Sequence, residues 1–337
     1  MEFGWDVPNV HHGFGLEEYA MGDRYTQTVA VNVDTFDRVS ARAQEIGFHA
    51  IWVADHLVFP DVSEVPHPFG YVSNSGRDNA ADEHQVRSDD PVYEAITTMT
   101  YLAARTTTCR IGVGVLVIPY RNPILAAKML STLDVLSGGR VILAAGVGWL
   151  KNAFDVLGAD YEHRGAVTNE YLDVMRLIWK DRHPQFEGEF FTLPPGLQFN
   201  PKPVQQPGIP VWVGGVSKPA LRRAATRGDG WLGVYQTVED TVAMHDTIRR
   251  QAADAGRDPG ELTFAHRLRF QVTDEGGGDQ PCIGSPQAIA DAIWRYHDAG
   301  VQHLLLAPPP GPTTDYLVEQ VDRFEAEVKP LVEDLWD

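Results

Sequence analysis

The chain has 337 residues, of which 43% are hydrophobic and 22% charged, which is the composition of an ordinary globular protein. Its formal net charge of −18 argues against nucleic acid and against an anionic membrane surface as partners, because both bind basic faces. The two cysteines, Cys109 and Cys282, show neither CxxC spacing nor a metal-binding pattern, so we expect no disulfide framework and no metal site. The N-terminus lacks a signal-peptide pattern and no apolar stretch reaches about 18 residues, which predicts a cytoplasmic protein.

Short apolar runs alternate along the chain with longer segments of helical period, and glycine or proline marks most of the boundaries. The apolar runs predict strands that begin near residues 2, 49, 110, 140, 210, 230, 262 and 302. The other segments predict helices over residues 34–47, 91–104, 122–139, 150–157, 164–181, 218–226, 238–255, 285–300 and 314–335. We expect Asp34 to cap the first helix, and Asn122 with Pro123 to form the N-cap and N1 pair of the third.

Eight strands, each followed by helical sequence, are typical of a parallel α/β fold. No GxGxxG motif follows the first strand, and eight is the strand number of a closed barrel. We therefore predict one (β/α)8-barrel (TIM-barrel) domain over residues 1–337 rather than a doubly wound sheet. The segment 60–90 is polar, aperiodic and rich in Pro, Gly and Ser, which predicts a lid or insertion loop, because loops this long are usually functional.

In such a barrel the active site lies at the C-terminal ends of the strands. The second strand ends in Asp55 and His56. Because neighbours on a strand face opposite sides, one of them can point into the mouth while the other braces a neighbour. Histidine is the usual side chain for proton exchange near neutral pH, which makes His56 the candidate catalytic residue. The alternative is a capping aspartate beside a hydrogen-bonded structural histidine.

Glycines mark further strand ends. Gly214 and Gly215 lie between an apolar strand and a helix, where backbone N–H groups suit a phosphate, although an ordinary strand–helix turn has the same pattern. Ser217 either caps that helix or binds the phosphate. Gly112 and Gly114, inside the third strand, indicate either the close approach of a ligand or barrel curvature.

Five segments carry a family pattern, in order over most of the chain. They are WVADH at 52–56, TTTCRIGVGVLVIPYRNPILAAKMLSTLDVLSGGRVILAAGVGW at 106–149, RGAVTNEYLDVMRLIW at 164–179, PVWVGGVSKPALRRAA at 210–225 and GDGW at 228–231. They resemble the luciferase-like monooxygenase family of bacterial luciferase-like flavin and deazaflavin oxidoreductases, and the block at 106–149 is highly specific to it. The chain is most similar to the branch that uses coenzyme F420, a deazaflavin.

The resemblance implies a luciferase-like (β/α)8 barrel and a set of roles. A cis peptide between Gly114 and Val115 would form a bulge against the back of the flavin ring. Asp55 would contact the ring system, and His56 would lie near its hydride-transferring face. The other implied cofactor contacts are Val147 and Asn152 after the fourth strand, and Gly214, Gly215 and Val216 at the phosphate.

One position departs from the pattern. Some sugar-phosphate dehydrogenases of the family carry a glutamate directly after the GxG of the fourth strand, where this chain has Trp149. The acid that exchanges a proton with the substrate in those enzymes is therefore missing, which puts sugar-phosphate oxidation in doubt. Trp149 itself either lines the site or belongs to the core.

The resemblance thus implies a coenzyme F420-dependent oxidoreductase that transfers a hydride between the deazaflavin and a small organic substrate. The alternatives are an FMN-dependent monooxygenase that uses reduced flavin and O2, and a non-catalytic flavin- or deazaflavin-binding protein. The acidic tail of F420 favours a basic exit, for which the candidates, if not merely a solvated helix face, are Lys218, Arg222 and Arg223.

Similar family members are often homodimers, which makes the helices at 91–105 and 123–136 candidates for an interface. Their apolar residues include Ile124, Leu125, Met129 and Leu130. The alternative is that these residues only cover the barrel, because any barrel helix has one apolar face.

Overall fold

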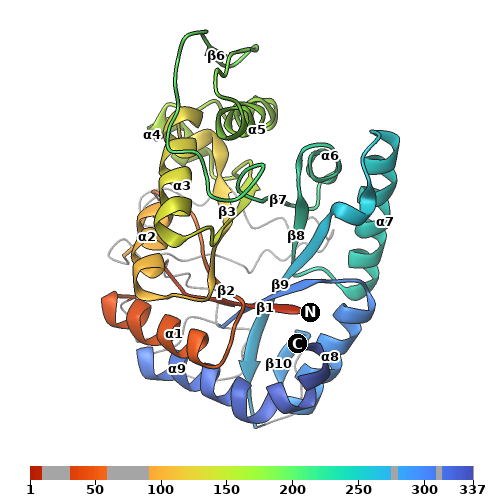
Figure 1. Cartoon of the computed structure of the whole chain (residues 1–337). Helices are drawn as coiled ribbons and strands as arrows, with labels where there is room; N and C mark the ends of the chain where they lie inside the picture. The colour runs from red at the N-terminus through yellow and green to blue at the C-terminus, as the bar shows by residue number, and fades with distance from the viewer. Residues whose placement is uncertain (10–30, 59–90, 275–279, 309–312, 337) are drawn as a thin grey trace.

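Eight parallel strands close into a barrel in the computed structural model of the chain, which describes residues 1–9, 31–58, 91–274, 280–308 and 313–336 (Figure 1). The barrel strands are β1 (Glu2–Asp6), β2 (Ala50–Val53), β3 (Arg110–Val117), β4 (Val141–Gly146), β7 (Val211–Gly214), β8 (Gly230–Val234), β9 (Thr263–Val272) and β11 (His303–Ala307). Their order around the sheet is β9-β11-β1-β2-β3-β4-β7-β8, and the pairing of β8 with β9 closes it. Each strand begins within one residue of its predicted start, so the prediction of a closed α/β barrel is confirmed.

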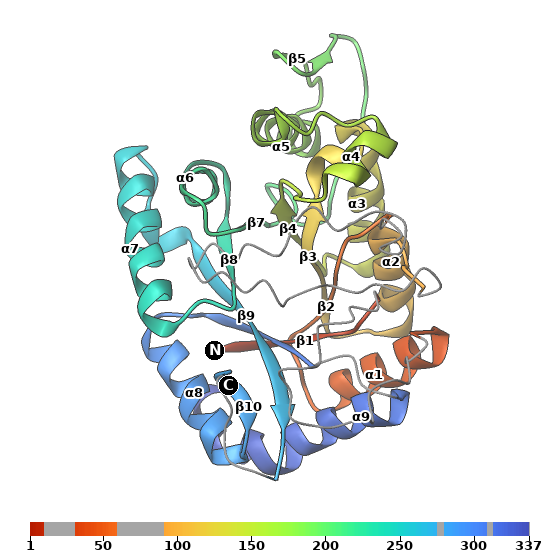
Figure 2. The same ribbon diagram turned by 180° about the vertical axis from the view of Figure 1, so that it is seen from behind.

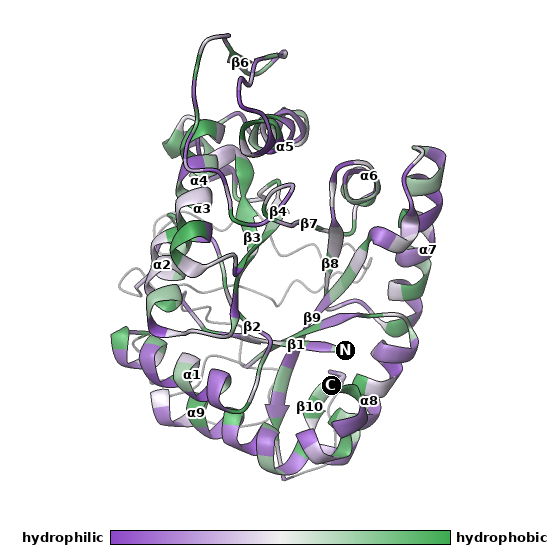
Figure 3. Cartoon of the chain, viewed as in Figure 1, coloured by the Kyte–Doolittle hydropathy of each residue, from purple (hydrophilic) through white to green (hydrophobic). Residues whose placement is uncertain are grey.

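Helices follow the strands and surround the barrel, as the two opposite views show (Figures 1 and 2). They are α1 (Val33–Glu45), α2 (Ala95–Arg105), α3 (Pro123–Ser137), α4 (Lys151–Leu157), α5 (Arg164–Lys180), α6 (Lys218–Arg227), α7 (Val238–Asp254), α8 (Pro286–Asp298) and α9 (Thr314–Arg323). Hydrophobic and hydrophilic residues alternate along their ribbons (Figure 3). In α7 the buried residues are Thr241, His245, Ile248 and Ala252, which share one face because they are three or four positions apart.

Some helix boundaries differ from the prediction, because side-chain caps decide them. The N-cap of α1 is Asn32, whose side chain accepts a hydrogen bond from the Thr35 amide at 3.1 Å, and Asp34 lies in the first turn. Helix α2 begins four residues after Pro91, because Glu94 caps it. The last predicted helix ends at Arg323 and continues as a π-helical turn over Phe324–Val328.

The described residues contain three short strands that were not predicted. The strands β5 (Phe186–Glu187) and β6 (Thr192–Leu193) form a small antiparallel hairpin that projects beyond α5 (Figure 1), and β10 (Cys282–Gly284) pairs with the end of β9. The predicted lid at 60–90 lies wholly outside the described residues. Among the helices that the structure describes, none is long and apolar enough to cross a membrane.

Two tryptophans share the interior of the barrel with branched aliphatic residues such as Ile142, Leu232 and Leu305, which are the usual filling. Trp52 on β2 and Trp212 on β7 are buried, and their ring centroids lie 5.4 Å apart. Neighbouring glycines make the room for them: a Cβ on Gly112 would lie 2.3 Å from the Trp52 ring, and one on Gly4 would lie 2.5 Å from its Nε1. Gly112 is therefore explained by the close approach of a tryptophan rather than of a ligand.

The residues proposed for a dimer interface divide into two groups. Ile124 and Met129 pack against the core and Leu130 is buried, as a helix that covers the barrel requires. Leu125 remains 55% exposed, and Leu136 at the end of α3 is 70% exposed. Exposed leucines of this kind are what a homodimer would cover, so dimerisation through α2 and α3 stays a prediction.

We expect the double change Leu125→Asp and Leu136→Asp to convert a dimer into a monomer, because it places two carboxylates in the apolar interface. Sedimentation at micromolar concentration measures the change. The matched control is Val156→Asp, which alters an equally exposed apolar residue on α4, outside the expected interface. A wild-type chain that already sediments as a monomer contradicts the prediction.

Candidate active site

The strand ends that carry the predicted site are neighbours in the barrel. Sheet order runs β2-β3-β4-β7, so the residues after these strands line one continuous arc of the C-terminal mouth. Asp55 follows β2, Val147 follows β4 and Gly215 follows β7. Asn152 lies in the first turn of α4, directly beyond the end of β4.

The middle of this arc is a bulge in β3. The peptide between Gly114 and Val115 is cis, as the family resemblance implies, and the pairing of β3 with β4 shifts register between Gly114 and Leu116. The Val115 side chain lies over two glycines: a Cβ on Gly146 or on Gly214 would come within 2.4 Å of a Val115 methyl group. Both positions therefore need glycine, because a larger residue would displace Val115 and with it the bulge.

Replacing Gly146 by alanine should displace Val115 and distort the bulge. Overpacking of this kind costs about 1–3 kcal/mol, and the stiff β-branched side chain leaves little room for adjustment. If the bulge supports a cofactor, binding should weaken roughly tenfold to a hundredfold in a fluorescence titration. The control is Gly165→Ala in α5, where the new methyl would meet only Arg223 at 3.5 Å. If the cofactor affinity of Gly146→Ala is unchanged, the bulge is not part of the cofactor-binding site.

The Asp55 side chain stabilises the ends of β2 and β3 at this arc. Its side chain is fully buried, and its carboxylate accepts two hydrogen bonds from the Arg121 guanidinium, both at 2.7 Å, and one from the Val117 amide at 2.9 Å. Arg121 also donates to Glu94 at 2.7 Å. Asp55 thus ties the end of β2 to the end of β3 and to the cap of α2, and its predicted contact with a cofactor ring stays a prediction.

His56 is the next residue along the chain and is partly buried at the same strand end. Trp52, four residues earlier, faces the interior of the barrel, while Asp55 is directed toward β3 and Arg121. One member of the Asp55–His56 pair therefore does brace a neighbour, as the sequence suggested. The catalytic role of His56 stays a prediction.

The turn after β7 exposes its backbone at the C-terminal mouth of the barrel. Gly215 is exposed with φ +106°, a conformation that favours glycine, and its carbonyl accepts a hydrogen bond from Trp231 Nε1 at 2.9 Å. Trp231 belongs to the GDGW segment, so a structural role of that segment is to fix the conformation of this turn. Ser217 caps α6 and accepts a hydrogen bond from the Ala220 amide at 3.4 Å. Val216, between them, is partly buried.

The predicted basic exit needs one correction. Lys218 and Arg222 are exposed at the start of α6, but Arg223 is buried. Its guanidinium donates to the Asn169 side chain at 2.6 Å and to the Gly165 carbonyl at 2.9 Å, and burial lowers the pKa of Arg223 to about 10. Arg223 therefore joins α6 to α5 and is not available to a ligand at the mouth.

The profile of the luciferase-like monooxygenase family matches residues 1–276, which is most of the chain. The chain belongs to this family. Within it, the chain is 30% identical over 289 residues to an uncharacterised protein of Mycobacterium tuberculosis strain H37Rv, covering 85% of this chain and 91% of the relative. It is 26% identical to an FMNH2-dependent dimethylsulfone monooxygenase of Pseudomonas putida, over 76% of this chain and 62% of that one.

The barrel is also similar to solved structures. A structure described as an F420-dependent secondary alcohol dehydrogenase in complex with an F420-acetone adduct superposes with a TM-score of 0.72. The superposition covers 98% of each chain at 20% sequence identity, so the likeness concerns the fold. Membership of the luciferase-like family makes the protein an oxidoreductase that works with a flavin or a deazaflavin.

Two charged residues of this luciferase-like barrel escaped the sequence analysis. Arg121 follows β3 in the segment PYRNP. The one sequence feature that could have pointed to a buried ion pair is an arginine placed between two apolar segments. Arg267 on β9 pairs with Asp6 at the end of β1, and burial raises the pKa of the Asp6 carboxyl despite that partner. Neither pair is predictable from spacing, because the partners are 66 and 261 residues apart.

The turn after β4 is shaped by another glycine. Gly148 has φ +78°, and a Cβ there would come within 2.7 Å of Val117 and 2.8 Å of Phe154. The neighbours Val147 and Trp149 are partly buried, as is Asn152. Trp149 is therefore placed at the same strand end as the predicted cofactor contacts.

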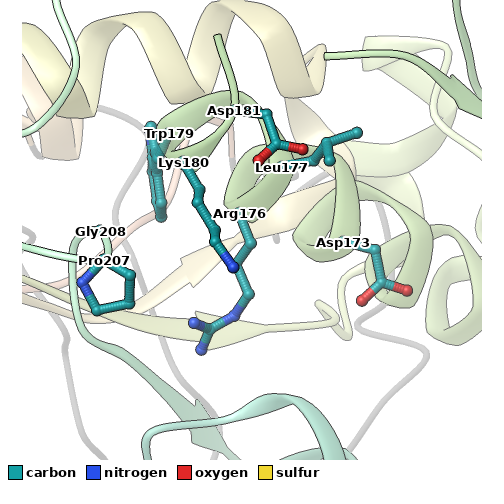
Figure 4. Close-up of a pocket in the computed structure, with 8 residues that line it drawn as sticks. All are labelled: Asp173, Arg176, Leu177, Trp179, Lys180, Asp181, Pro207 and Gly208. Carbon is teal, nitrogen blue, oxygen red and sulfur yellow. The ribbon is translucent and has the colours of Figure 1, made fainter. Parts of the chain in front are cut away.

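Two cavities lie away from this mouth. One, of about 410 Å³, lies between the C-terminal half of α5 and the segment at Pro207 and Gly208, and Arg176, Trp179 and Lys180 line it (Figure 4). The other, of about 690 Å³, is lined by residues at the starts of the strands, so it opens at the opposite, N-terminal end of the barrel. Neither is lined by the strand ends of the predicted site, and active sites in barrels of this kind lie at the C-terminal end.

Proposed function

We propose that the protein is a coenzyme F420-dependent oxidoreductase that transfers a hydride between the deazaflavin and a small organic substrate. The observation that carries the cofactor choice is the charge beside the turn after β7. Lys218, the first residue of α6, is exposed three residues after the exposed Gly215, and Arg222 is exposed in the second turn of the same helix, in a chain whose net charge is −18. Basic side chains at this point suit the acidic tail of F420 better than the single phosphate of FMN.

The residues present fit a flat cofactor with a phosphate. The bulge at Gly114–Val115 offers backbone and one small side chain as a platform for a ring. Gly215 and Val216 offer backbone N–H groups just before the N-terminus of α6, where the helix dipole favours an anion. Val147 and Asn152 extend the same arc after β4, and we propose them as further contacts along the cofactor.

We expect Gly215→Glu to weaken cofactor binding on the order of a hundredfold or more, because it places a carboxylate where the phosphate binds. A fluorescence titration measures the dissociation constant. The control is Gly215→Ala, which shares the cost of a side chain at φ +106° and the 3.3 Å approach to Ala220 but adds no charge. Equal losses in the two variants would mean that strain, not an anion site, explains the effect.

In this proposal the cofactor supplies the hydride chemistry, and the chain binds, orients and moves a proton. His56 stands at the mouth as the proton donor, acceptor or orienting group for the substrate. Asp55, held by Arg121, fixes the strand end from which His56 projects. Ser217 holds the N-terminus of α6 in place below the phosphate.

The second candidate is an FMN-dependent monooxygenase that uses reduced flavin and O2. The observation that favours it is the 26% identity to the FMNH2-dependent dimethylsulfone monooxygenase of Pseudomonas putida. The platform and the phosphate turn suit either cofactor, so only the charge at Lys218 and Arg222 separates the two candidates.

The test is titration of the apoprotein with F420 and with FMN, each followed by fluorescence. We expect F420 to bind more tightly, and the double change Lys218→Ala and Arg222→Ala to reduce that preference while leaving FMN affinity nearly unchanged. Tighter binding of FMN, together with O2 consumption when reduced FMN is supplied, would overturn the proposal in favour of the monooxygenase. Binding of neither would contradict both candidates.

A further inference from the structure

We propose that Trp52, His303 and Glu2 form a proton-coupled electron donor beneath the bulge at Gly114–Val115, and that Trp212 extends it toward the N-terminal end of the barrel. This inference rests on the proposed function, because the electron acceptor is an oxidised flavin or deazaflavin on that platform. The oxidant that the experiment uses is the same cofactor in its photoexcited state.

The three side chains form a continuous hydrogen-bonded row. An indole N–H only donates, so His303 Nε2 accepts from Trp52 Nε1 at 3.2 Å. The proton of the neutral imidazole is then on Nδ1, which lies 3.0 Å from Glu2 Oε2 and donates to it. His303 is fully buried, whereas the Glu2 side chain is about half exposed. The row therefore leads from a buried indole to a carboxylate in contact with solvent.

The indole end of the row reaches the cofactor platform. A Cβ on Gly114 would lie 3.5 Å from Trp52 Cε3 and 3.2 Å from a Leu232 methyl group, so the tryptophan lies close beneath the bulge, beside Leu232. On its other side Trp52 meets Trp212, with ring centroids 5.4 Å apart, and Trp212 meets His303 at 5.2 Å. Trp212 and Glu2 both line the cavity of about 690 Å³ at the N-terminal end of the barrel. Aromatic rings thus connect the two ends of the barrel.

The row places polar atoms in the interior of the barrel. Branched aliphatic side chains usually fill such an interior, and they carry no polar atoms. Here a histidine is buried completely, at a cost in desolvation that lowers the pKa of His303. Gly4 makes room for both rings, since a Cβ there would lie 2.5 Å from Trp52 Nε1 and 2.7 Å from His303 Nε2.

The electron and proton transfers balance as follows. Trp52 gives one electron to the photoexcited oxidised cofactor and releases its Nε1 proton to His303 Nε2. His303 passes its Nδ1 proton to the Glu2 carboxylate, which becomes neutral. The oxidised indole is then a neutral radical. It regains an electron from the reduced cofactor, or from Trp212, and a proton returns along the same row.

The test is time-resolved fluorescence and transient absorption of the holoprotein, loaded with oxidised F420 or FMN after binding has been measured. We expect short-lived cofactor fluorescence and a neutral indolyl radical in the wild type. Trp52→Phe should lengthen the lifetime severalfold and abolish the radical. His303→Gln should keep the short lifetime but leave an indole radical cation. Trp179→Phe is the control, because it changes a buried, hydrogen-bonded tryptophan outside the barrel.

The wild type supplies a second measurement that needs no variant. Formation of the neutral radical should slow in D2O, because a proton moves with the electron. An unquenched cofactor in the wild type, a lifetime unchanged in Trp52→Phe, or a radical without a solvent isotope effect would each overturn the inference. Failure of both cofactors to bind would instead contradict the proposed function, and the binding step detects that first.

Discussion

Replacing His56 by alanine is expected to lower turnover by roughly 10²–10⁴-fold, because a general acid or base usually contributes that much to the rate. Cofactor affinity should change by less than about tenfold, since the phosphate turn and the platform belong to other strands. Steady-state kinetics and a fluorescence titration of the same preparation separate the two effects.

The control for this change is His183→Ala, which removes an exposed histidine beyond the end of α5. It should affect neither the rate nor the affinity. A more conservative change, His56→Asn, keeps a polar side chain that cannot exchange a proton near neutral pH. Turnover of this variant should be almost as slow as that of His56→Ala. Full activity of His56→Ala on an authentic substrate would remove the catalytic role while leaving the cofactor site untouched.

The barrel was predictable because its signals are local. Each strand is a short apolar run with a turn residue at its boundary, and such runs do not depend on distant partners. The cis peptide at Gly114–Val115 was predictable only from the family resemblance, because nothing in the residues GVGV distinguishes it from an ordinary strand. The sequence also did not decide why a glycine stands at position 112. Only the distance to Trp52 shows that the tryptophan ring occupies the space that a side chain would need.

Contacts between distant segments were the part that sequence reasoning missed. Arg223 lies in a basic run that is typical of a solvated helix face, yet it is buried against α5 through Asn169, 54 residues earlier. The hairpin β5–β6 has only two residues in each strand, too few for a periodic pattern. For Asp55, alternation along the strand predicted a bracing role for one residue of the pair but did not identify Arg121 as the partner.

Replacing Arg121 by alanine is expected to lower the free energy of unfolding by about 3–5 kcal/mol, because it leaves a buried carboxylate without its counter-charge. The Asp55 side chain has no exposed surface, and that of Arg121 is 9% exposed. The Val117 amide remains as the only other hydrogen bond that we describe to that carboxylate. Chemical denaturation measures the loss, and the slope of the transition tests whether it stays two-state.

The chain contains a matched surface pair. Arg105 donates to both oxygens of Asp37 at 2.8 Å, through Nε and one terminal nitrogen, but its side chain is 52% exposed. Arg105→Ala should therefore cost less than about 1 kcal/mol, since exposed ion pairs contribute little. Both pairs are bidentate arginine–aspartate pairs, so the contrast between the two arginines tests mainly the effect of burial. They also differ in that Arg121 donates to Glu94, whereas Asp37 accepts a further hydrogen bond from Tyr101.

A double change shows whether the lost stability comes from the stranded carboxylate or from lost packing. In Asp55→Asn combined with Arg121→Ala no charge is buried, so the protein should be more stable than Arg121→Ala alone. If instead the two changes add, the guanidinium acts through its contacts with Glu94 and the start of α2, and Asp55 is not what it stabilises. In that case Arg121→Ala should leave the kinetics of the protein near those of wild type. If the carboxylate is stranded, the end of β2 shifts and turnover falls, because His56 projects from that segment.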